Sequence, residues 1–372
     1  MYMVILPQVL VMIKVLFICS SLERTGPTNQ LLNIVSSLHD RVEYTIITLS
    51  EEPLKSLKKD FIKLGINIYC ITSSKYGFFS RIKEINRLAK ENDILQTQGV
   101  RADFISAILG GKNMTTLRNY PFEDYPSLYG YYKGNLMAYA HLFLLKFINI
   151  RITVSDSTAE KNSIKTGICF NVIYNGVDIN KFSLASQDVI FNIKNKYKLD
   201  VEKKTVIYTG PLIERKNVEL LINIINNKPS LQFLIVGDGP LINSLKEAVT
   251  GHNIIFTGVV DNINELLSVS DCFIMFSKSE GFPNSVIEAL SVGLPCLLSD
   301  IPSHRDVSKM ISYGVKLFSS QHDLNNFFDT EFEYFLLYHQ RMKIRNLAID
   351  KLSSEAMSDR YFLLYENLLY GK

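Results

Sequence analysis

The chain has 372 residues, of which 47 % are hydrophobic and 21 % are charged, and its formal net charge is +3. This length predicts two domains, and the small net charge without basic runs argues against a nucleic-acid partner. The five cysteines are scattered, and the histidines include no pair at metal-ligand spacing. These patterns indicate buried thiols in a reducing, cytoplasmic environment, without a disulfide framework or a protein-bound metal.

The N-terminal twenty residues are apolar, but a proline, a glutamine and Lys14 interrupt them. A membrane span needs about 20 uninterrupted apolar residues, and no small-residue cleavage site follows. We therefore expect 14–20 to be the first buried strand. Residues 1–11 are then an extra tail upstream of a start at Met12.

Short β-branched runs alternate with amphipathic segments along the N-terminal half, which predicts a parallel sheet with helices on both faces. The expected strands are 14–20, 44–49, 67–71, 94–96, 113–117, 151–155 and 171–174, and the expected helices are 29–38, 54–64, 80–90 and 104–109. The aromatic segment 129–150 is expected to be one long helix. It either packs in the N-terminal core, which we favour, or contacts the inner face of the membrane or a lipid-linked acceptor.

The polar, lysine-rich segment 187–204 is the expected linker, and a second strand–helix alternation follows it. The expected strands are 205–209, 232–236, 254–257, 272–276 and 295–299, and the expected helices are 217–226, 240–249, 263–269, 285–292 and a tail over 329–370. Open parallel sheets bind ligands beyond the carboxyl ends of their strands, so the informative residues should follow strands.

The segment 277–295 (SKSEGFPNSVIEALSVGLP) follows a predicted strand and opens a helix, with Asn284 or Ser285 as the expected N-cap. A helix N-terminus offers N–H donors and the positive end of a dipole, which suit a phosphate. Glu280 precedes the helix and Glu288 lies inside it. Their carboxylates are suitable acceptors for sugar and ribose hydroxyls.

This pattern, S-x-x-E-G-F-x-N-S-x-x-E-A-x-x-x-G-x-P, resembles the signature of retaining glycosyltransferases of the GT-B fold, the glycogen-synthase-like and bacterial-polysaccharide group. The resemblance implies that Glu280 contacts the transferred sugar and that Glu288 holds the ribose hydroxyls. The donor-binding residues that it implies between them are Gly281, Phe282, Asn284 and Ser285. A capped helix with an incidental acidic pair is the alternative interpretation.

The segment 208–217 (YTGPLIERKN) resembles the family's G-R-L-x-x-x-K-[GN] loop, with Gly210 at the glycine. Lys216 falls on the lysine that neutralises the donor diphosphate. Pro211 occupies the position of the family's arginine, so Arg215 is the candidate for the missing cation. A solvated basic loop is the alternative.

Three weaker matches follow in the expected order. Residues 236–240 resemble the family's G-D-G-P turn. Residues 257–260 match a loop whose backbone near Val260 reads the nucleotide base. Residues 174–178, together with Phe182, are similar to the family's P-N-G-V-D-x-x-x-F, which we expect to be architectural.

The N-terminal motifs depart further from the family. Gly26 matches the second glycine of a G-G loop that approaches the donor phosphates, and Thr25 replaces the first. Residues 96–103 (QTQGVRAD) resemble H-x-H-x-x-x-A-D, with glutamine at both histidine positions. Gln98 stands where many members have a sugar-contacting histidine, and it can form hydrogen bonds but cannot carry charge.

The resemblance implies an α/β GT-B fold with two Rossmann-like, doubly wound parallel-sheet domains facing a cleft. Residues 12–190 would form the acceptor-side domain and 200–345 the donor domain. Residues 346–372 would form a C-terminal helix that crosses back to the first domain.

The implied reaction moves a sugar from a nucleoside-diphosphate sugar to an acceptor hydroxyl with retention at the anomeric carbon. Lys216, Arg215 and Glu280 are the expected catalytic residues. The implied co-substrate is a nucleotide sugar, with UDP as the commonest base in this group, and no cofactor is bound by the protein. The implied acceptor is a glycan or lipid-linked glycan of a bacterial surface polysaccharide.

Three alternatives remain open from the sequence. A catalytically silent homologue serving as a binding subunit would explain Pro211, Gln96 and Gln98, although Lys216 and the two glutamates argue against it. A GT-B-fold nucleotide-sugar epimerase would use the same donors. A nicotinamide-dependent oxidoreductase needs G-x-G-x-x-G after the first strand, where this chain offers one glycine.

Overall fold

The computed structural model describes residues 12–371, so the expected tail at 1–11 lies outside the described residues. The described chain divides into two compact units. Unit 1 runs to Thr153 and adds Asn162–Ile173 and the C-terminal residues from Ser358, whereas unit 2 comprises Val154–Lys161 and Tyr174–Met357. The predicted domain ranges and the cleft between the domains stay predictions.

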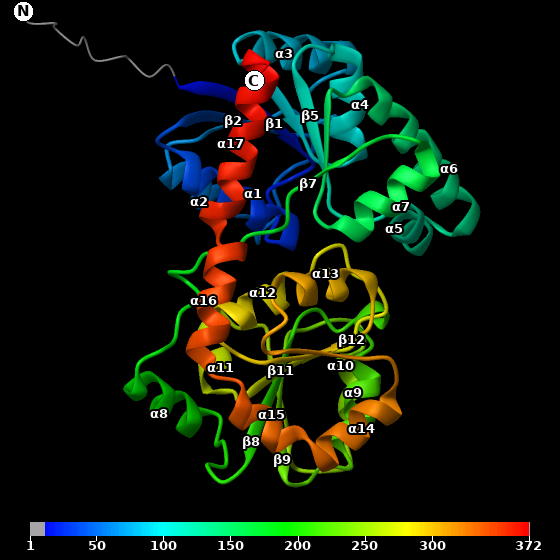
Figure 1. Cartoon of the computed structure of the whole chain (residues 1–372). Helices are drawn as coiled ribbons and strands as arrows, with labels where there is room; N and C mark the ends of the chain where they lie inside the picture. The colour runs from blue at the N-terminus through cyan, green and yellow to red at the C-terminus, as the bar shows by residue number, and fades with distance from the viewer. Residues whose placement is uncertain (1–11, 372) are drawn as a thin grey trace, which may run out of the picture. The chain divides into compact units, whose positions relative to one another are not determined.

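Unit 1 contains a parallel seven-stranded sheet in the order β3-β2-β1-β4-β5-β6-β7, with helices on both sides (Figure 1). Its strands are β1 (Ile13–Cys19), β2 (Val42–Thr48), β3 (Asn67–Cys70), β4 (Ile94–Thr97), β5 (Asn113–Leu117), β6 (Ile150–Thr153) and β7 (Asn171–Val172). Its helices are α1 (Gly26–Leu38), α2 (Lys58–Lys63), α3 (Phe78–Lys90), α4 (Val100–Leu109), α5 (Pro121–Tyr129) and α6 (Tyr131–Leu144), and α7 (Asp156–Thr166) joins the two units. The strand order reverses between β1 and β4, which is where doubly wound sheets bind ligands.

Unit 2 contains a parallel six-stranded sheet in the order β10-β9-β8-β11-β12-β13. Its strands are β8 (Lys204–Thr209), β9 (Leu231–Val236), β10 (Ile254–Gly258), β11 (Cys272–Met275), β12 (Cys296–Ser299) and β13 (Val315–Phe318). Its helices are α8 (Gln187–Lys196), α9 (Val218–Ile225), α10 (Ile242–Glu247), α11 (Ile263–Val269), α12 (Asn284–Ser291), α13 (Pro302–Met310), α14 (Gln321–Thr330), α15 (Phe332–Tyr338) and α16 (Arg341–Leu352). Here the order reverses between β8 and β11.

The central strands are largely buried and rich in apolar residues because helices cover both faces of each sheet. In β1, six of the seven side chains of IKVLFIC are buried, and all six side chains of β9 are buried. The same continuous apolar runs made these strands predictable from the sequence, and the structure confirms the two doubly wound sheets.

The last helix, α17 (Ser354–Tyr370), confirms the expected crossing back, because its residues from Ser358 onward belong to unit 1. Tyr361 and Tyr365 are both fully buried there. The hydroxyl of Tyr365 donates a hydrogen bond of 2.5 Å to Oε1 of Gln96 and lies 3.2 Å from the hydroxyl of Tyr44. These contacts make the C-terminus a structural part of unit 1.

The expected long helix over 129–150 is confirmed over α6 but is shorter, because Gly130 separates α6 from α5 and the helix ends at Leu144. Gly130 has φ +82°, a left-handed conformation that ends α5. The two helices then pack closely, since a Cβ on Gly134 would lie 2.3 Å from the backbone nitrogen of Pro126. A 3₁₀ turn and β6 occupy the end of the segment.

Two further expectations need correction. Most of the expected linker at 187–204 is α8, whose N-cap Ser186 accepts a hydrogen bond from the backbone nitrogen of Val189. The expected helix over 54–64 shortens to α2, because Ser56 accepts a hydrogen bond from the backbone nitrogen of Lys58 and so starts the helix late. Elements α5, α7, α13, β13 and α14 were not expected.

Across residues 12–371, no helix combines the length and the apolar character that crossing a bilayer requires. In the same residues, no cluster of three or more His, Cys, Asp or Glu side chains is arranged to hold a metal ion.

Candidate active site

Two loops leave neighbouring strands at the point where the strand order of unit 2 reverses. One follows β8 and contains Arg215 and Lys216, and the other follows β11 and contains Glu280. The carboxyl ends of adjacent parallel strands lie at the same edge of a sheet, so these loops meet there.

The two loops are joined by a compact ion cluster. Nζ of Lys216 lies 2.7 Å from Oε1 of Glu280, and NH1 of Arg215 lies 3.0 Å from Oε2. The Lys216 and Glu280 side chains are 9 % and 7 % exposed, whereas that of Arg215 is 41 % exposed. NH1 of Arg215 also donates to the carbonyl of Ser279. The structure thus brings together all three residues expected to be catalytic.

The pKa of each of the two buried groups in this cluster depends on the charges of its neighbours. Burial raises the pKa of Glu280, but Lys216 and then Arg215 outweigh it and hold that pKa at about 2. Burial lowers the pKa of Lys216, although Glu280 opposes this shift. The cluster carries two cations and one carboxylate, so it keeps a net positive charge that suits an anionic ligand.

The G-D-G-P turn positions the loop after β8 through close backbone contact. Gly237 has φ +133°, and a Cβ there would lie 1.9 Å from the carbonyl oxygen of Gly210. A Cβ on Gly239 would lie 2.5 Å from the carbonyl oxygen of Leu212. Only glycine allows this close approach. The role of the motif is therefore to support the loop after β8, which contains Lys216.

The N-terminus of α12 lies directly after Glu280. The helix starts at Asn284, and Pro283 is its N-cap without a side-chain hydrogen bond. The expectation of Asn284 or Ser285 as the capping residue is therefore wrong. Oδ1 of Asn284 instead accepts a hydrogen bond of 2.8 Å from Nδ2 of Asn175.

The Y-N-G-V-D segment holds this helix start in place. Asn175 also donates to the carbonyl of Phe282 at 3.3 Å, and the rings of Tyr174 and Phe282 lie 5.1 Å apart. The geometry is consistent with the architectural role expected for the segment. The remaining predicted residues Gly281 and Ser285 flank Phe282 and Asn284 in the same turn.

Glu288 lies one turn into α12 and is half-buried. Burial raises the pKa of Glu288 to about 7, and the charge of Lys181 only partly opposes this shift. Within residues 12–371, no group donates a hydrogen bond to its carboxylate. Glu288 is therefore an acceptor whose hydrogen-bonding capacity is unused, as a ligand-binding carboxylate requires.

His304, in the first turn of α13, is a residue that the sequence analysis did not identify. Its ring is fully buried, and Nδ1 lies 2.8 Å from the carbonyl oxygen of Ser299. Nε2 has no hydrogen-bond partner in the described chain. Burial lowers the pKa of His304 to about 4, with smaller effects from Glu280 and Lys216. His304 is therefore a neutral imidazole whose Nε2 forms no hydrogen bond in the described chain, and it lies close enough to the ion cluster to feel its charges.

Unit 1 has its own cavity of about 480 Å³ at the carboxyl ends of β1, β4 and β5. Its lining includes Thr25, Thr28, Gln98, Arg118, Tyr125 and His141. Gly26 starts α1 between two lining residues. This cavity lies where the strand order reverses, so it is the candidate ligand site of unit 1.

Gln96 and Gln98, which stand where the family motif has histidines, have different surroundings. Gln96 is buried and accepts the Tyr365 hydrogen bond, so its position is structural. Gln98 lines the cavity and accepts a hydrogen bond of 3.0 Å from Nε of Arg118. Only Gln98 is placed to contact a ligand.

A buried chain of polar side chains supports the wall of this cavity. Asp103 accepts hydrogen bonds from Thr97 at 2.5 Å and from Thr115 at 2.6 Å. Its other oxygen lies 2.6 Å from Nε2 of His141, whose Nδ1 lies 2.7 Å from the hydroxyl of Tyr125. The Asp103 carboxylate accepts from Nε2 of His141, and a hydrogen bond joins Nδ1 to the Tyr125 hydroxyl. A hydroxyl oxygen has two lone pairs, so the Tyr125 oxygen keeps acceptor capacity in the cavity wall.

Val260, the expected base-reading residue, follows β10 at the edge of the unit 2 sheet and is partly buried. Strand β9 separates β10 from β8, so Val260 is not part of the ion cluster. Its role stays a prediction.

Comparison with known proteins points to one family. Residues 189–324 match the family model described as "Glycosyl transferases group 1". An O-antigen biosynthesis glycosyltransferase of Escherichia coli, WclY, is 23 % identical over 367 residues, which cover 95 % of this chain and 98 % of WclY. A UDP-Gal:alpha-D-GlcNAc-diphosphoundecaprenol alpha-1,3-galactosyltransferase of Escherichia coli is 35 % identical over 144 residues, covering 35 % of this chain and 36 % of that protein.

Among solved structures, Anabaena HepE in complex with UDP and glucose has a TM-score of 0.82 at 17 % identity. The alignment covers 95 % of this chain and 100 % of HepE. Two doubly wound parallel sheets with a returning C-terminal helix define a protein of the GT-B class. The matched part of the chain, residues 189–324 of unit 2, is similar to the group 1 glycosyltransferases, as the motifs of that unit indicated.

Proposed function

We propose that this glycosyltransferase transfers a hexose from a UDP-sugar to an acceptor hydroxyl, with retention at the anomeric carbon. The observation that carries the proposal is the positive cluster of Lys216, Arg215 and Glu280 beside the start of α12. HepE, which has the same fold, was crystallised with UDP and glucose. The nucleotide assignment extends that finding to this chain.

The donor diphosphate would lie between Lys216 and the N-terminus of α12. The first N–H groups of a helix have no acceptor within it, and its dipole favours negative charge. Glu288 would accept hydrogen bonds from the two ribose hydroxyls. Glu280 would accept from the transferred sugar while it keeps Lys216 oriented.

The chemical step breaks the bond from the anomeric carbon to the diphosphate oxygen. A bond from the anomeric carbon to the acceptor oxygen forms on the same face, and the acceptor proton passes to the departing phosphate oxygen. Negative charge builds up on the diphosphate, where Lys216 and Arg215 stabilise it. Such preorganised charge stabilisation is usually the largest catalytic contribution.

The cavity of unit 1 is the proposed acceptor site. The Tyr125 oxygen, fixed through His141 and Asp103, would accept a hydrogen bond from an acceptor hydroxyl. WclY and the diphosphoundecaprenol galactosyltransferase support a glycan of a bacterial surface polysaccharide as the acceptor class.

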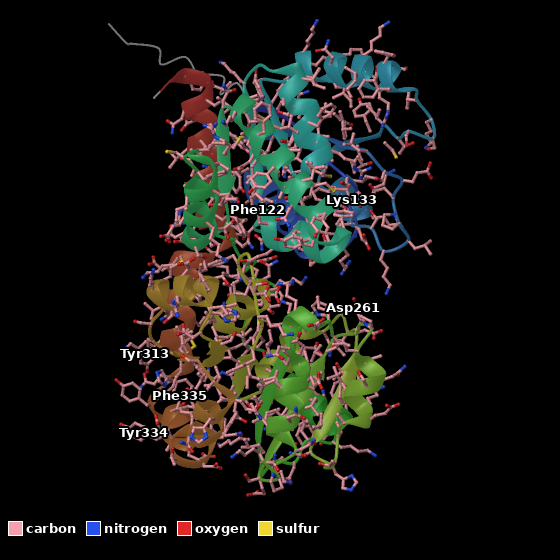
Figure 2. The ribbon with its side chains drawn as sticks, turned by 90° about the vertical axis from the view of Figure 1, so that its right-hand side faces the viewer. Phe122, Lys133, Asp261, Tyr313, Tyr334 and Phe335 are labelled. Atoms are coloured by element: carbon pink, nitrogen blue, oxygen red, sulfur yellow. The ribbon has the colours of Figure 1, made fainter. Side chains whose placement is uncertain are left out.

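We also propose that α6 lies against a membrane surface. One of its faces packs inward through Ala138 and Leu142, as the core alternative predicted. The opposite face and the following turn expose apolar side chains at helical spacing: Tyr132, Leu136, Tyr139, Phe143 and Phe147. Lysines flank this stripe, and Figure 2 labels Lys133 on α6 and Phe122 on neighbouring α5. Aromatic side chains with lysines suit the interface of an anionic bilayer.

Thermal unfolding against UDP, GDP, ADP and NAD, with Glu288→Ala as the control, tests the donor assignment. Binding to the native state at 100 times Kd stabilises a protein by about 2.7 kcal/mol. We expect UDP alone to raise the unfolding temperature of the wild type, and we expect no rise in the variant. Stabilisation by NAD alone would refute the proposal, and no stabilisation by any of the four would favour a silent homologue. Release of a changed sugar nucleotide without acceptor would favour an epimerase.

A further inference from the structure

Unit 1 contains a second cavity, of about 340 Å³, outside the candidate acceptor site. Helices α3 and α4 form most of its wall, and Leu49 and Leu144 complete it. Its volume lies within the range of about 300–1,000 Å³ that small-molecule sites occupy. Most of the lining is apolar: Leu49, Phe78, Ile82, Ile85, Val100, Phe104, Ile105 and Leu144.

The only charged side chains in this lining are Arg81 and Arg101. Nε of Arg81 is buried without a hydrogen-bond partner in the described chain, and its guanidinium lies 5.9 Å from the Phe78 ring centre. Arg101 donates a hydrogen bond of 2.9 Å to the hydroxyl of Ser50. Neither arginine has a carboxylate within ion-pair distance in residues 12–371. Two uncompensated cations beside an apolar cavity fit an apolar chain that carries an anion.

The position of the cavity connects it to both features already described. Val100 and Arg101 line it and also line the candidate acceptor cavity. Leu144 is the last residue of α6, next to Phe143 of the exposed stripe. The cavity therefore lies between the acceptor site and the surface proposed to face lipid.

We propose that this cavity binds the lipid carrier of the acceptor, as a hydrocarbon chain attached to a phosphate or diphosphate. Phe78, Ile82 and Phe104 would enclose the first part of the chain. Arg81 and Arg101 would hold the phosphate at the border with the acceptor cavity, which leaves the glycan to extend into that cavity. The inference rests on the proposed function, because it assigns the acceptor a lipid-linked form.

Binding can be measured directly, because the chain has no tryptophan. Phe104→Trp places a single fluorophore in the cavity wall, where the native side chain is 42 % exposed. In the full chain, we expect farnesyl diphosphate to change its emission in a saturable way. Farnesol and inorganic diphosphate should each bind at least about tenfold more weakly, because each lacks one of the two parts that the cavity recognises.

Arginine variants identify the residues that hold the anion. Arg81→Gln and Arg101→Gln, each with Phe104→Trp, should weaken farnesyl diphosphate binding about tenfold, the order expected for one charge-assisted hydrogen bond. Arg87→Gln is the matched control, because Arg87 lies on α3 but pairs with Glu84 and Glu91 outside the cavity. That variant should bind like the parent protein.

Besides an absence of farnesyl diphosphate binding, three outcomes would overturn the inference: equal binding of inorganic diphosphate, unchanged binding in both arginine variants, or a response to phosphatidylglycerol vesicles alone. The last would assign the arginines to a bilayer surface. UDP stabilisation of the same proteins separates this test from the donor assignment. If UDP stabilises them but farnesyl diphosphate does not bind, the lipid inference fails and the proposed function stands; the reverse result removes the proposed function and leaves a lipid site.

Discussion

Lys216 serves both the fold and the proposed reaction, because the partner of its ammonium group is the buried Glu280. Lys216→Ala should lower kcat by about 10²–10³, the effect of removing one preorganised charge contact. It should also cost about 1–3 kcal/mol of unfolding free energy, less than for an isolated buried pair because Arg215 still contacts Glu280. UDP release and thermal unfolding measure the two effects.

Lys278→Ala is the control for this prediction. Lys278 lies in the same region but pairs with the exposed Glu214. We expect no measurable change in turnover or stability. If Lys216→Ala turned over like the wild type while remaining folded, Lys216 would have no part in the mechanism.

Glu288 should make stability depend on pH in the opposite sense to an ion-paired carboxylate. Its folded-state pKa of about 7 lies above the usual glutamate value of about 4.5, so the native state holds the proton to higher pH. The contribution of Glu288 to the free energy of unfolding is fully present below about pH 4.5, and it is lost as the pH rises through 7. Glu288→Gln should therefore be more stable than the wild type at pH 8, by roughly 1–3 kcal/mol. At pH 4.5 the two should be alike.

Denaturant unfolding at pH 4.5 and 8 measures this difference, and calorimetric titration with UDP measures the accompanying loss of affinity. Ribose hydroxyls need the carboxylate form, so wild-type UDP affinity should rise with pH through 7. A variant with wild-type pH dependence and wild-type affinity would exclude Glu288 from the donor site.

At the scale of elements, the contact between the loops after β8 and β9 depends on Gly237. Gly237→Ala would place a Cβ 1.9 Å from the carbonyl oxygen of Gly210, at φ +133°. We expect a loss of about 3 kcal/mol or more, together with loss of activity as the Lys216 loop shifts. Gly258→Ala, at φ +68° with open space around it, should cost about 1 kcal/mol. Equal losses in denaturant unfolding would show that backbone conformation, and not the close contact, matters.

The strands and both sheets could be predicted because buried parallel strands are continuous apolar runs. The N-terminal ends of helices were harder to predict, because Ser56, just before α2, and Ser186, the N-cap of α8, lie within polar segments. Such segments have the composition of loops. The break at Gly130 depends on how closely α5 and α6 pack, and that contact has no local sequence pattern.

The candidate donor site was largely predictable, because Lys216, Glu280 and Glu288 lie in motifs that directly follow strands. The hydrogen bonds that support the wall of the acceptor cavity were not predictable. Asp103 and His141 are 38 residues apart in the sequence and come into contact only in the folded chain. His304 follows β12, and its place after a strand was the one signal that could have identified it.

At the scale of the whole molecule, α17 should be essential to unit 1. Tyr365→Phe removes the hydroxyl that donates to Gln96 and leaves that buried carbonyl without its partner. We expect a loss of about 1–3 kcal/mol in unfolding free energy. Tyr370→Phe, on the same helix at a side chain that is 61 % exposed, is the control and should change nothing. Thermal unfolding of both variants gives the comparison, and equal stability would contradict the structural role of Tyr365.

The return of the chain at Ser358 also sets the order in which the protein can fold during synthesis. Domains usually fold as the ribosome releases them, N-terminal first. Here the sheet of unit 2 is complete before the last helix is made, whereas unit 1 lacks Tyr361 and Tyr365 until translation ends. The half of the protein that is translated first is therefore finished last, and its unfinished surface is the part that a chaperone would meet on the nascent chain.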